Sequence, residues 1–209
     1  MSGLAFSLPK GACLVICGEN GSGKSTLLDL LSGYREPLKG IIEIEGKKAS
    51  SIRGELALLP QNIDYFLLGQ TVEEELGLSA ADVKDDQEGA LSLASAWGFS
   101  SASRTRVDAL SPGEKKRLAL IGALSGRPRA LFLDEPFSGL DWSGTVTLTG
   151  DLRRLKERGE TVILSTHEPG LVGDVADYWL FVSKELAPFF TGDRKELESR
   201  FAEYKVRPF

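Results

Sequence analysis

The stretch Gly18-Glu19-Asn20-Gly21-Ser22-Gly23-Lys24-Ser25-Thr26 decides the fold. It follows the apolar run 12–17 and opens a helix expected over 25–32, which is the context that a phosphate-binding loop needs. The glycines let backbone N–H groups point at β- and γ-phosphates, Lys24 supplies a point charge, and the Ser25 hydroxyl can ligate Mg²⁺. The helix N-terminus adds partial positive charge. The alternative, a Gly-rich turn that only caps a helix, leaves the Lys24-Ser25 pair unexplained.

Outward from this loop, short apolar runs alternate with helical segments. The runs are bounded by glycine or charge, which is typical of strands in a parallel sheet that is covered on both faces. We therefore expect an α/β core, with strands over 12–17, 130–133, 161–165 and 178–182 and helices over 25–32 and 144–158.

Two stretches break this alternation. In 40–46, Ile42 and Ile44 alternate with glutamates, which predicts a half-exposed strand in a small antiparallel patch. The stretch 71–104 is rich in Ala, Leu, Glu, Asp and Ser and lacks β-branched runs, so we expect an inserted group of short helices. The whole chain, 1–209, is then a single domain. Its core spans 1–60 and 115–209, and its helical lobe spans about 61–114.

The end of the sequence indicates one more helix. Asp193 and Glu196 have the spacing of a capping box, and three apolar residues follow at helical spacing: Leu197, Phe201 and Tyr204. We expect a terminal packing helix over 193–205.

Composition excludes several classes of protein. The 209 residues include 25 Lys+Arg and 30 Asp+Glu, a net charge of −5, with 42% hydrophobic residues, which is ordinary for a globular chain rather than a disordered one. The acidic balance disfavours nucleic acid as a partner. No window approaches the ~18 apolar residues of a membrane span, and no export signal is present at the N-terminus.

Cys13 and Cys17 would share one strand face about 13 Å apart, too far for a disulfide, so we interpret them as buried thiols.

Two carboxylates and the only histidine follow apolar strands. Asp134 and Glu135 come directly after 130–133, and His167 follows 161–165. Parallel strands deliver their ends to one sheet edge, so all three should lie beside the phosphate loop. Asp134 is assigned to the metal, directly or through water, and Glu135 to general base or water orientation. His167 would contact the γ-phosphate and hold the attacking water without being the base. By themselves, such acids are more often solvated and a lone histidine is more often structural.

Two further elements are weak in isolation. Gln61 ends a strand-like segment over 56–61, where its amide could reach Mg²⁺ or the attacking water. Residues 110–114, Leu-Ser-Pro-Gly-Glu, precede a helix with basic residues in its first turn. Ser111 could serve only as a helix N-cap, but a basic first turn opposes the helix dipole unless an anion is nearby.

Together these motifs resemble those of an ABC (ATP-binding cassette) ATPase. The phosphate loop, Gln61, 110–114, 134–136, 138–141 and His167 occur in that family's order, over essentially the whole chain. The resemblance implies the ABC ATPase fold, ATP and Mg²⁺ as ligands, and a head-to-tail dimer with an identical or a related cassette. Ser111 and Gly113 would then bind the γ-phosphate of the partner's ATP, and Asp141 would link the two sites. Closure on ATP and opening after hydrolysis would be the power stroke.

More narrowly, residues 60–75 look like the segment after the Gln loop in energy-coupling-factor importers of cobalt, nickel and vitamins. That resemblance implies a transmembrane partner whose helix docks in a groove near the Gln loop. Tyr65, Phe66 and Leu67 would line this groove, or else belong to the core of the helical lobe.

The chain departs from the family pattern in three places. The signature reads Leu-Ser-Pro-Gly-Glu instead of the usual Leu-Ser-Gly-Gly-Gln, so Glu114 is expected to alter affinity. Only Phe6 precedes Gly18 as an aromatic residue, and it looks like a strand residue rather than an adenine-stacking one. Either the chain begins late or another residue stacks the base. The sequence also ends after the last expected helix, so we expect no appended regulatory domain.

The leading hypothesis is therefore an ATPase subunit of a membrane importer. It would be cytoplasmic and peripheral on the membrane, held there by an integral membrane protein. The alternative is a soluble ABC ATPase of an assembly machine, such as iron–sulfur cluster assembly. The cargo and the choice between a homodimer and a heterodimer stay open.

Overall fold

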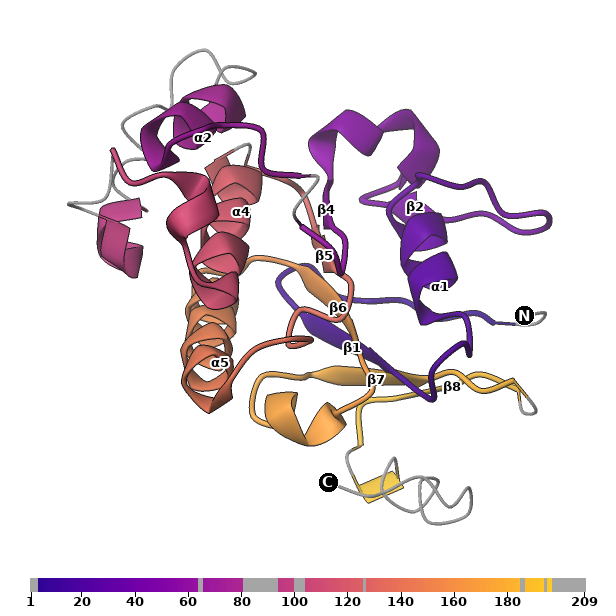
Figure 1. Ribbon diagram of the computed structural model, residues 1–209. Helices are drawn as coiled ribbons and strands as arrows, with labels where there is room; N and C mark the ends of the chain where they lie inside the picture. Colours follow the sequence, from indigo (N-terminus) through magenta and orange to yellow (C-terminus); the bar gives the residue numbers. More distant parts are fainter. Residues whose placement is uncertain are drawn as a thin grey trace.

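A six-stranded sheet forms the centre of the molecule (Figure 1). The computed structural model describes residues 4–63, 66–80, 94–99, 104–125, 127–184, 187–193 and 195–196. Its strand order is β4-β5-β6-β1-β7-β8, in which only β8 runs antiparallel to its neighbour. The strands are β1 (Cys13–Cys17), β4 (Ala57–Leu59), β5 (Leu131–Leu133), β6 (Val162–Thr166), β7 (Tyr178–Phe181) and β8 (Phe189–Thr191).

The register of the parallel strands brings their carboxyl ends to one edge. Cys17, the last residue of β1, pairs with Thr166 of β6 and Phe181 of β7. Leu133, the last residue of β5, pairs with Leu164 of β6. The segments that leave these strands therefore start side by side, as the sequence predicts for the phosphate loop, the two carboxylates and the histidine.

Side chains of β1 alternate between two cores. Cys13, Val15 and Cys17 face one core, which also contains buried residues of α4 (Pro112–Ser125) and α5 (Trp142–Glu157). Leu14 and Ile16 face the other core, under α1 (Lys24–Leu31). Helices thus cover both faces of the sheet, and the expected α/β core is confirmed. The two cysteines share a face and are buried free thiols, as predicted.

The antiparallel patch is present but shorter than 40–46. It consists of β2 (Glu43–Ile44) and β3 (Lys47–Lys48), which pair antiparallel. Glu45 and Gly46, with φ of 50° and 77°, form the turn that ends β2 and reverses the chain into β3. Two 3₁₀ turns, Ala49–Ser51 and Arg53–Glu55, then lead into β4.

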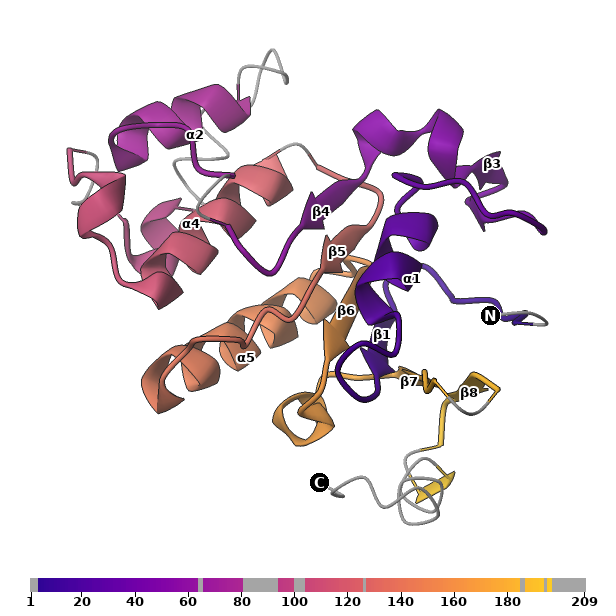
Figure 2. The same ribbon diagram turned by 45° about the vertical axis from the view of Figure 1, so that its right-hand side comes forward.

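A helical lobe extends from the sheet, as Figure 2 shows. It contains α2 (Val72–Ala80), the π-helical turn Ser95–Phe99 and the 3₁₀ turn Val107–Ala109, and α2 packs on α4. The described parts of 71–104 are thus helical, as expected, and 81–93 and 100–103 lie outside the described residues.

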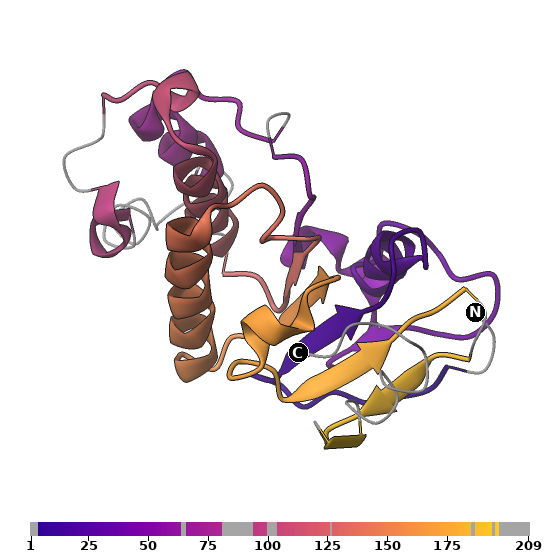
Figure 3. The same ribbon diagram turned by 60° about the horizontal axis from the view of Figure 1, so that its bottom comes forward.

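The N-terminal segment packs against the β8 edge of the sheet, which Figure 3 shows from below. The ring of Phe6 stacks on Phe190 of β8 at 4.9 Å between centroids, and Tyr178 stacks on the same ring at 5.4 Å. Phe6 therefore packs beside the sheet and belongs to no strand in the structure. The start of the expected terminal helix is described only at 193 and 195–196, where the Asp193 carboxylate accepts a hydrogen bond from the Lys195 amide. The rest of it lies outside the described residues.

Candidate nucleotide-binding and hydrolysis site

The phosphate loop requires glycine at its turns. Gly18, Gly21 and Gly23 have φ of 153°, 75° and 100°, which side-chain-bearing residues rarely adopt. Gly18 also lies against the chain leaving β7, because a Cβ there would be 2.0 Å from the Val182 carbonyl oxygen. The loop is thus held in a tight turn at the N-terminus of α1, where the helix dipole favours an anion.

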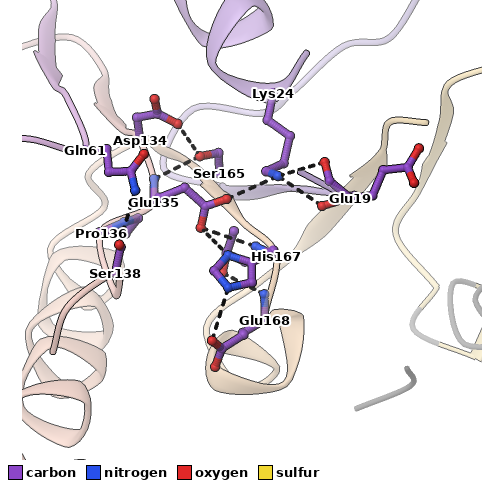
Figure 4. Close-up of polar contacts among 12 residues, drawn as sticks. Glu19, Lys24, Gln61, Asp134, Glu135, Pro136, Ser138, Ser165, His167 and Glu168 are labelled. Carbon is purple, nitrogen blue, oxygen red and sulfur yellow. Dashed lines mark hydrogen bonds and ion pairs between the residues drawn. The ribbon is translucent and has the colours of Figure 1, made fainter. Parts of the chain in front are cut away.

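Lys24 is buried in this loop, with 6% of its surface exposed. Its Nζ donates to the carbonyl oxygens of Gly18 and Glu19 at 3.0 and 3.2 Å. The same atom lies 3.2 Å from Oε1 of Glu135 (Figure 4). Lys24 therefore connects the loop after β1 with the carboxylate after β5.

Ser165 of β6 holds the side chain of Asp134 and the backbone of Glu135. Its hydroxyl donates to Oδ1 of Asp134 at 2.6 Å and accepts from the backbone amide of Glu135 at 2.9 Å. The Asp134 amide donates to the Leu59 carbonyl of β4 at 2.9 Å. Asp134 and Glu135 are fixed in this way against both neighbouring strands, close to the loop as predicted.

His167 completes a continuous chain of contacts. Its Nδ1 lies 2.9 Å from Oε2 of Glu135, and its backbone amide donates to the same oxygen at 3.3 Å. Its Nε2 lies 3.3 Å from a carboxylate oxygen of Glu168. Lys24, Glu135 and His167 thus lie together although they follow three different strands, β1, β5 and β6 (Figure 4).

Glu135 occupies an unusual backbone conformation. Its φ is 45°, in the left-handed region that disfavours residues with a side chain. The Ser165 hydroxyl, Lys24 and His167 together keep it there. Such strain clusters where a side chain must point in one direction for function.

The turn after Glu135 is attached to the second turn of α4. Because α4 begins at Pro112, its first turn contains Glu114, and the basic residues expected in the first turn start only at its fourth residue. Lys116 donates from Nζ to the carbonyl oxygens of Pro136 and Ser138 at 2.6 and 2.5 Å. Burial lowers the pKa of Lys116 to about 8, and the negative charge of Glu135 partly opposes this shift. The Gln61 side-chain amide donates to the Ser138 hydroxyl at 3.2 Å, so Gln61 also lies at this turn.

Two motifs that the resemblance assigns to the dimer cap helices in the structure: Ser111 for the partner's ATP, and Asp141 for the link between the two sites. Ser111 and Glu114 form a capping box at α4: the Ser111 amide donates to Glu114 Oε2 at 2.8 Å, and the Glu114 amide donates to Ser111 Oγ at 3.3 Å. This hydrogen bonding lowers the pKa of Glu114. Asp141 caps α5 by accepting from the Gly144 amide at 2.7 Å. Both motifs are exposed to solvent.

The residues at this edge fit a magnesium-bound triphosphate. The buried hydroxyl of Ser22 has no hydrogen-bond partner within the described part of the chain, which suits a phosphate oxygen. The neighbouring Ser25 and Thr26 are exposed beside it. The described residues contain no group of three acidic, histidine or cysteine side chains that could enclose a metal by themselves. The oxygen donors present, the Ser25 hydroxyl and the Asp134 carboxylate, are of the type that Mg²⁺ takes, with phosphates and water as its further ligands.

Three residues of this neighbourhood escaped the sequence analysis. Ser165 and Lys116 make their contacts across strands and helices that are distant in sequence. Lys184, after β7, donates its amide to a carboxylate oxygen of Glu19 at 3.3 Å. For Ser165 and Lys184 a signal was available, because both lie at the end of, or just after, a predicted strand.

Comparison with known proteins agrees with this geometry. Residues 1–138 match the family model described as ABC transporter. The energy-coupling factor transporter ATP-binding protein EcfA of Methanosphaera stadtmanae is 36% identical over 186 residues, which cover 82% of this chain and 66% of that protein. The cobalt import ATP-binding protein CbiO of Rhodobacter capsulatus is 37% identical over 188 residues, with 83% and 66% covered. The chain thus spans about two thirds of the length of these relatives.

Among solved structures, cbiO1 from Clostridium perfringens, part of the ABC transporter complex cbiONQ, superposes with a TM-score of 0.84. It is 25% identical, and the match covers 98% of this chain and 86% of that chain. The chain belongs to the ABC transporter family, which confirms the family and the fold expected from the sequence. Within the described ranges, no helix is long and apolar enough to cross a membrane.

Proposed function

We propose that this chain is the ATP-binding and ATP-hydrolysing subunit of a membrane importer of the energy-coupling-factor type. One observation carries the proposal: Glu135 lies between Lys24 of the phosphate loop and His167, at 3.2 and 2.9 Å. A carboxylate between a phosphate-binding cation and an imidazole is placed to activate water beside a terminal phosphate.

The roles follow from these contacts. Residues 18–26 bind the phosphates of ATP. When Lys24 moves from Oε1 of Glu135 to a phosphate oxygen, Oε1 is free to accept a proton from the attacking water. His167 and Gln61 orient that water and the γ-phosphate.

Three residues would hold Mg²⁺: Ser25, Asp134 and Gln61. The bound cation would neutralise charge on the β- and γ-phosphates. Ser165 fixes one oxygen of Asp134 and leaves the other for the metal or its water ligands.

Hydrolysis requires a second cassette, identical or related, in head-to-tail orientation. Ser111 and Gly113 of one subunit would complete the phosphate site of the other, and Asp141 would connect the two sites. The exposure of both caps supports this role, because groups at the two helix N-termini remain accessible to a partner.

The groove for the transmembrane partner lies in the helical lobe. A cavity of about 470 Å³ is lined by residues that include Leu67, Arg106, Val107 and Lys115. Glu75 fixes the loop at the rim of this cavity, because its carboxylate accepts hydrogen bonds from the backbone amides of Leu68 and Gly69 at 2.7 and 2.6 Å. Leu67 lines this cavity and also packs against the core, so it agrees with both expectations for this residue. Phe66 is 37% exposed beside it, and Tyr65 lies outside the described residues.

The lobe over about 61–114 would transmit motion between this groove and the ATP site, while 1–60 and 115–209 form the core.

The names of the relatives, an energy-coupling-factor subunit and a cobalt importer, favour import over the soluble alternative. Docking would place the chain on the cytoplasmic face of the membrane.

The first test is hydrolysis. The wild-type chain should release phosphate from ATP·Mg, and Glu135→Gln should bind ATP but lose activity by about 10²-fold or more, the usual contribution of a general base. Glu157→Gln, which removes an exposed carboxylate at the end of α5, is the matched control and should remain active. A Glu135→Gln variant that hydrolyses ATP at the wild-type rate contradicts the mechanism.

The second test is a pull-down of tagged Glu135→Gln with ATP·Mg from gently solubilised cells of the source organism. An integral membrane protein should be recovered with the chain. Recovery of a soluble scaffold with no membrane protein would move the chain to the assembly class, including iron–sulfur cluster assembly, and would end the transport proposal.

A further inference from the structure

The chain that leaves β7 runs along the phosphate loop. The Val182 amide donates to the Cys17 carbonyl at 2.8 Å, which continues the parallel pairing of β1 and β7. Gly18 has no room for a Cβ because the Val182 carbonyl lies against it. Two residues further on, the Lys184 amide donates to the Glu19 carboxylate at 3.3 Å. The segment 182–184 is therefore attached to the loop at two successive points.

This attachment places the Lys184 side chain over Gly21. A Cβ on Gly21 would lie 3.2 Å from Nζ and 3.3 Å from Cε of Lys184. Gly21 is required by its φ of 75°, and the end of the Lys184 side chain lies close beside it. The Lys184 ammonium therefore lies directly beside the loop that is expected to bind phosphate.

The charge of Lys184 is available to a ligand. Its side chain is exposed, and its ammonium makes no ion pair within 4.0 Å with any carboxylate in the described part of the chain. Glu19 accepts from the Lys184 backbone amide, not from the ammonium. Lys24, by contrast, is buried and already bonded to two carbonyl groups and to Glu135.

We propose that Lys184 is a second phosphate-binding cation of the nucleotide site and contacts a phosphate oxygen of bound ATP from the solvent side of the loop. The inference rests on the proposed function, because it names a further residue that binds the same substrate. An ammonium is a compact point charge on a flexible stem, so it can follow a phosphate that enters the loop. Because the contact is exposed, we expect an effect of only about three- to tenfold on affinity.

The test measures ATP affinity by titration calorimetry with the full-length chain. Lys184→Met keeps the apolar stem and removes the charge, and Lys184→Arg restores a charge. Lys39→Met, at an exposed lysine in the segment between α1 and β2, is the matched control for loss of one positive charge. Each variant is titrated with ATP and with adenosine at two salt concentrations, and thermal melting verifies folding.

We expect Lys184→Met to raise the Kd for ATP about three- to tenfold at low salt and less at high salt. Adenosine binding should not change, and Lys184→Arg should recover most of the ATP affinity. Equal ATP affinity in Lys184→Met and Lys39→Met overturns the inference and leaves the proposed function intact. Weaker binding that is independent of salt and not recovered by arginine also overturns it, since packing of the loop would then be the cause. A wild-type chain that binds no ATP overturns both.

Discussion

The Nζ atom of Lys24 lies 3.2 Å from Oε1 of Glu135, and both side chains are more than nine-tenths buried. Removing one partner leaves a buried charge without its counter-charge, so Lys24→Met and Glu135→Gln should each lower the free energy of unfolding. The double variant should lose less than the sum, with a coupling free energy of roughly 1–3 kcal/mol.

Denaturant unfolding of the three variants measures this coupling. Arg153, whose guanidinium pairs with Asp174 at 3.0 Å on the surface, offers a control cycle in which Arg153→Met and Asp174→Asn should couple by less than about 1 kcal/mol. If the buried pair couples no more strongly than this surface pair, the contact between Lys24 and Glu135 does not contribute to the stability of the site.

Ser165→Ala should reduce turnover while leaving ATP binding nearly unchanged. The hydroxyl positions Asp134 and the Glu135 backbone but does not belong to the phosphate loop. We expect kcat to fall about tenfold or more and KM to change less than twofold, with about 1–3 kcal/mol lost in stability because a buried amide loses its acceptor.

Ser32→Ala is the matched control for this variant. Ser32 is equally buried and donates to the Leu28 carbonyl at 2.7 Å at the end of α1, away from the carboxylates. It should lose stability without losing kcat. Equal losses of kcat in both variants would mean that Ser165 acts only through stability.

Trp142 should report dimer formation. It is 77% exposed directly after Asp141, whereas Trp97 and Trp179 are 5% and 2% exposed. ATP·Mg should shift the emission of Glu135→Gln to shorter wavelength as the head-to-tail partner covers Trp142. The shift should disappear in a Glu135→Gln/Trp142→Phe double variant. Dimerisation detected by sedimentation without any shift would place Trp142 outside the interface.

The two thiols predict an alkaline loss of stability. Burial is the main cause that raises the pKa of both Cys13 and Cys17 from 9.0 to about 12. Between these pH values the unfolded chain has lost the thiol protons that the folded chain keeps, so the free energy of unfolding falls as pH rises from 9 toward 12.

Denaturant midpoints at pH 8, 9 and 10 give the size of this loss. A Cys13→Ala/Cys17→Ala variant should start less stable but decline less steeply over the same range. A thiol reagent should react with the wild-type chain only after unfolding. Rapid labelling of the native chain at pH 8 would contradict the burial of both sulfurs.

The sequence alone predicted those features that depend on the residues of one short segment. Three glycines predict the turn of the phosphate loop, and Lys24 and Ser25 predict its chemistry. The apolar runs before Asp134 and His167 predict the strands after which these two side chains lie. The parallel sheet then brings them together with no further information. The family and the fold could be predicted for this reason.

What could not be predicted depends on contacts between distant segments. Lys116 binds carbonyl groups of the turn after β5, and Lys184 covers Gly21. Lys116 lies in the basic run after 110–114 and Lys184 follows the expected strand 178–182, but neither pattern reveals the distant groups that these lysines contact. The length of the antiparallel patch was overestimated because alternation in 40–46 does not reveal that the chain turns at Glu45 and Gly46, directly after the two residues of β2. Phe6 was placed in a strand because its ring partner, Phe190, is 184 positions away.

The φ of 45° at Glu135 has a consequence for how this position tolerates change. Glycine adopts that backbone conformation without penalty, and asparagine does so more readily than glutamate. Glutamate keeps this conformation only through its contacts with Lys24, His167 and the Ser165 hydroxyl. Glycine or asparagine at position 135 would relieve the backbone but leave the buried Lys24 ammonium without its counter-charge, so the backbone penalty and the ion pair oppose each other at this residue.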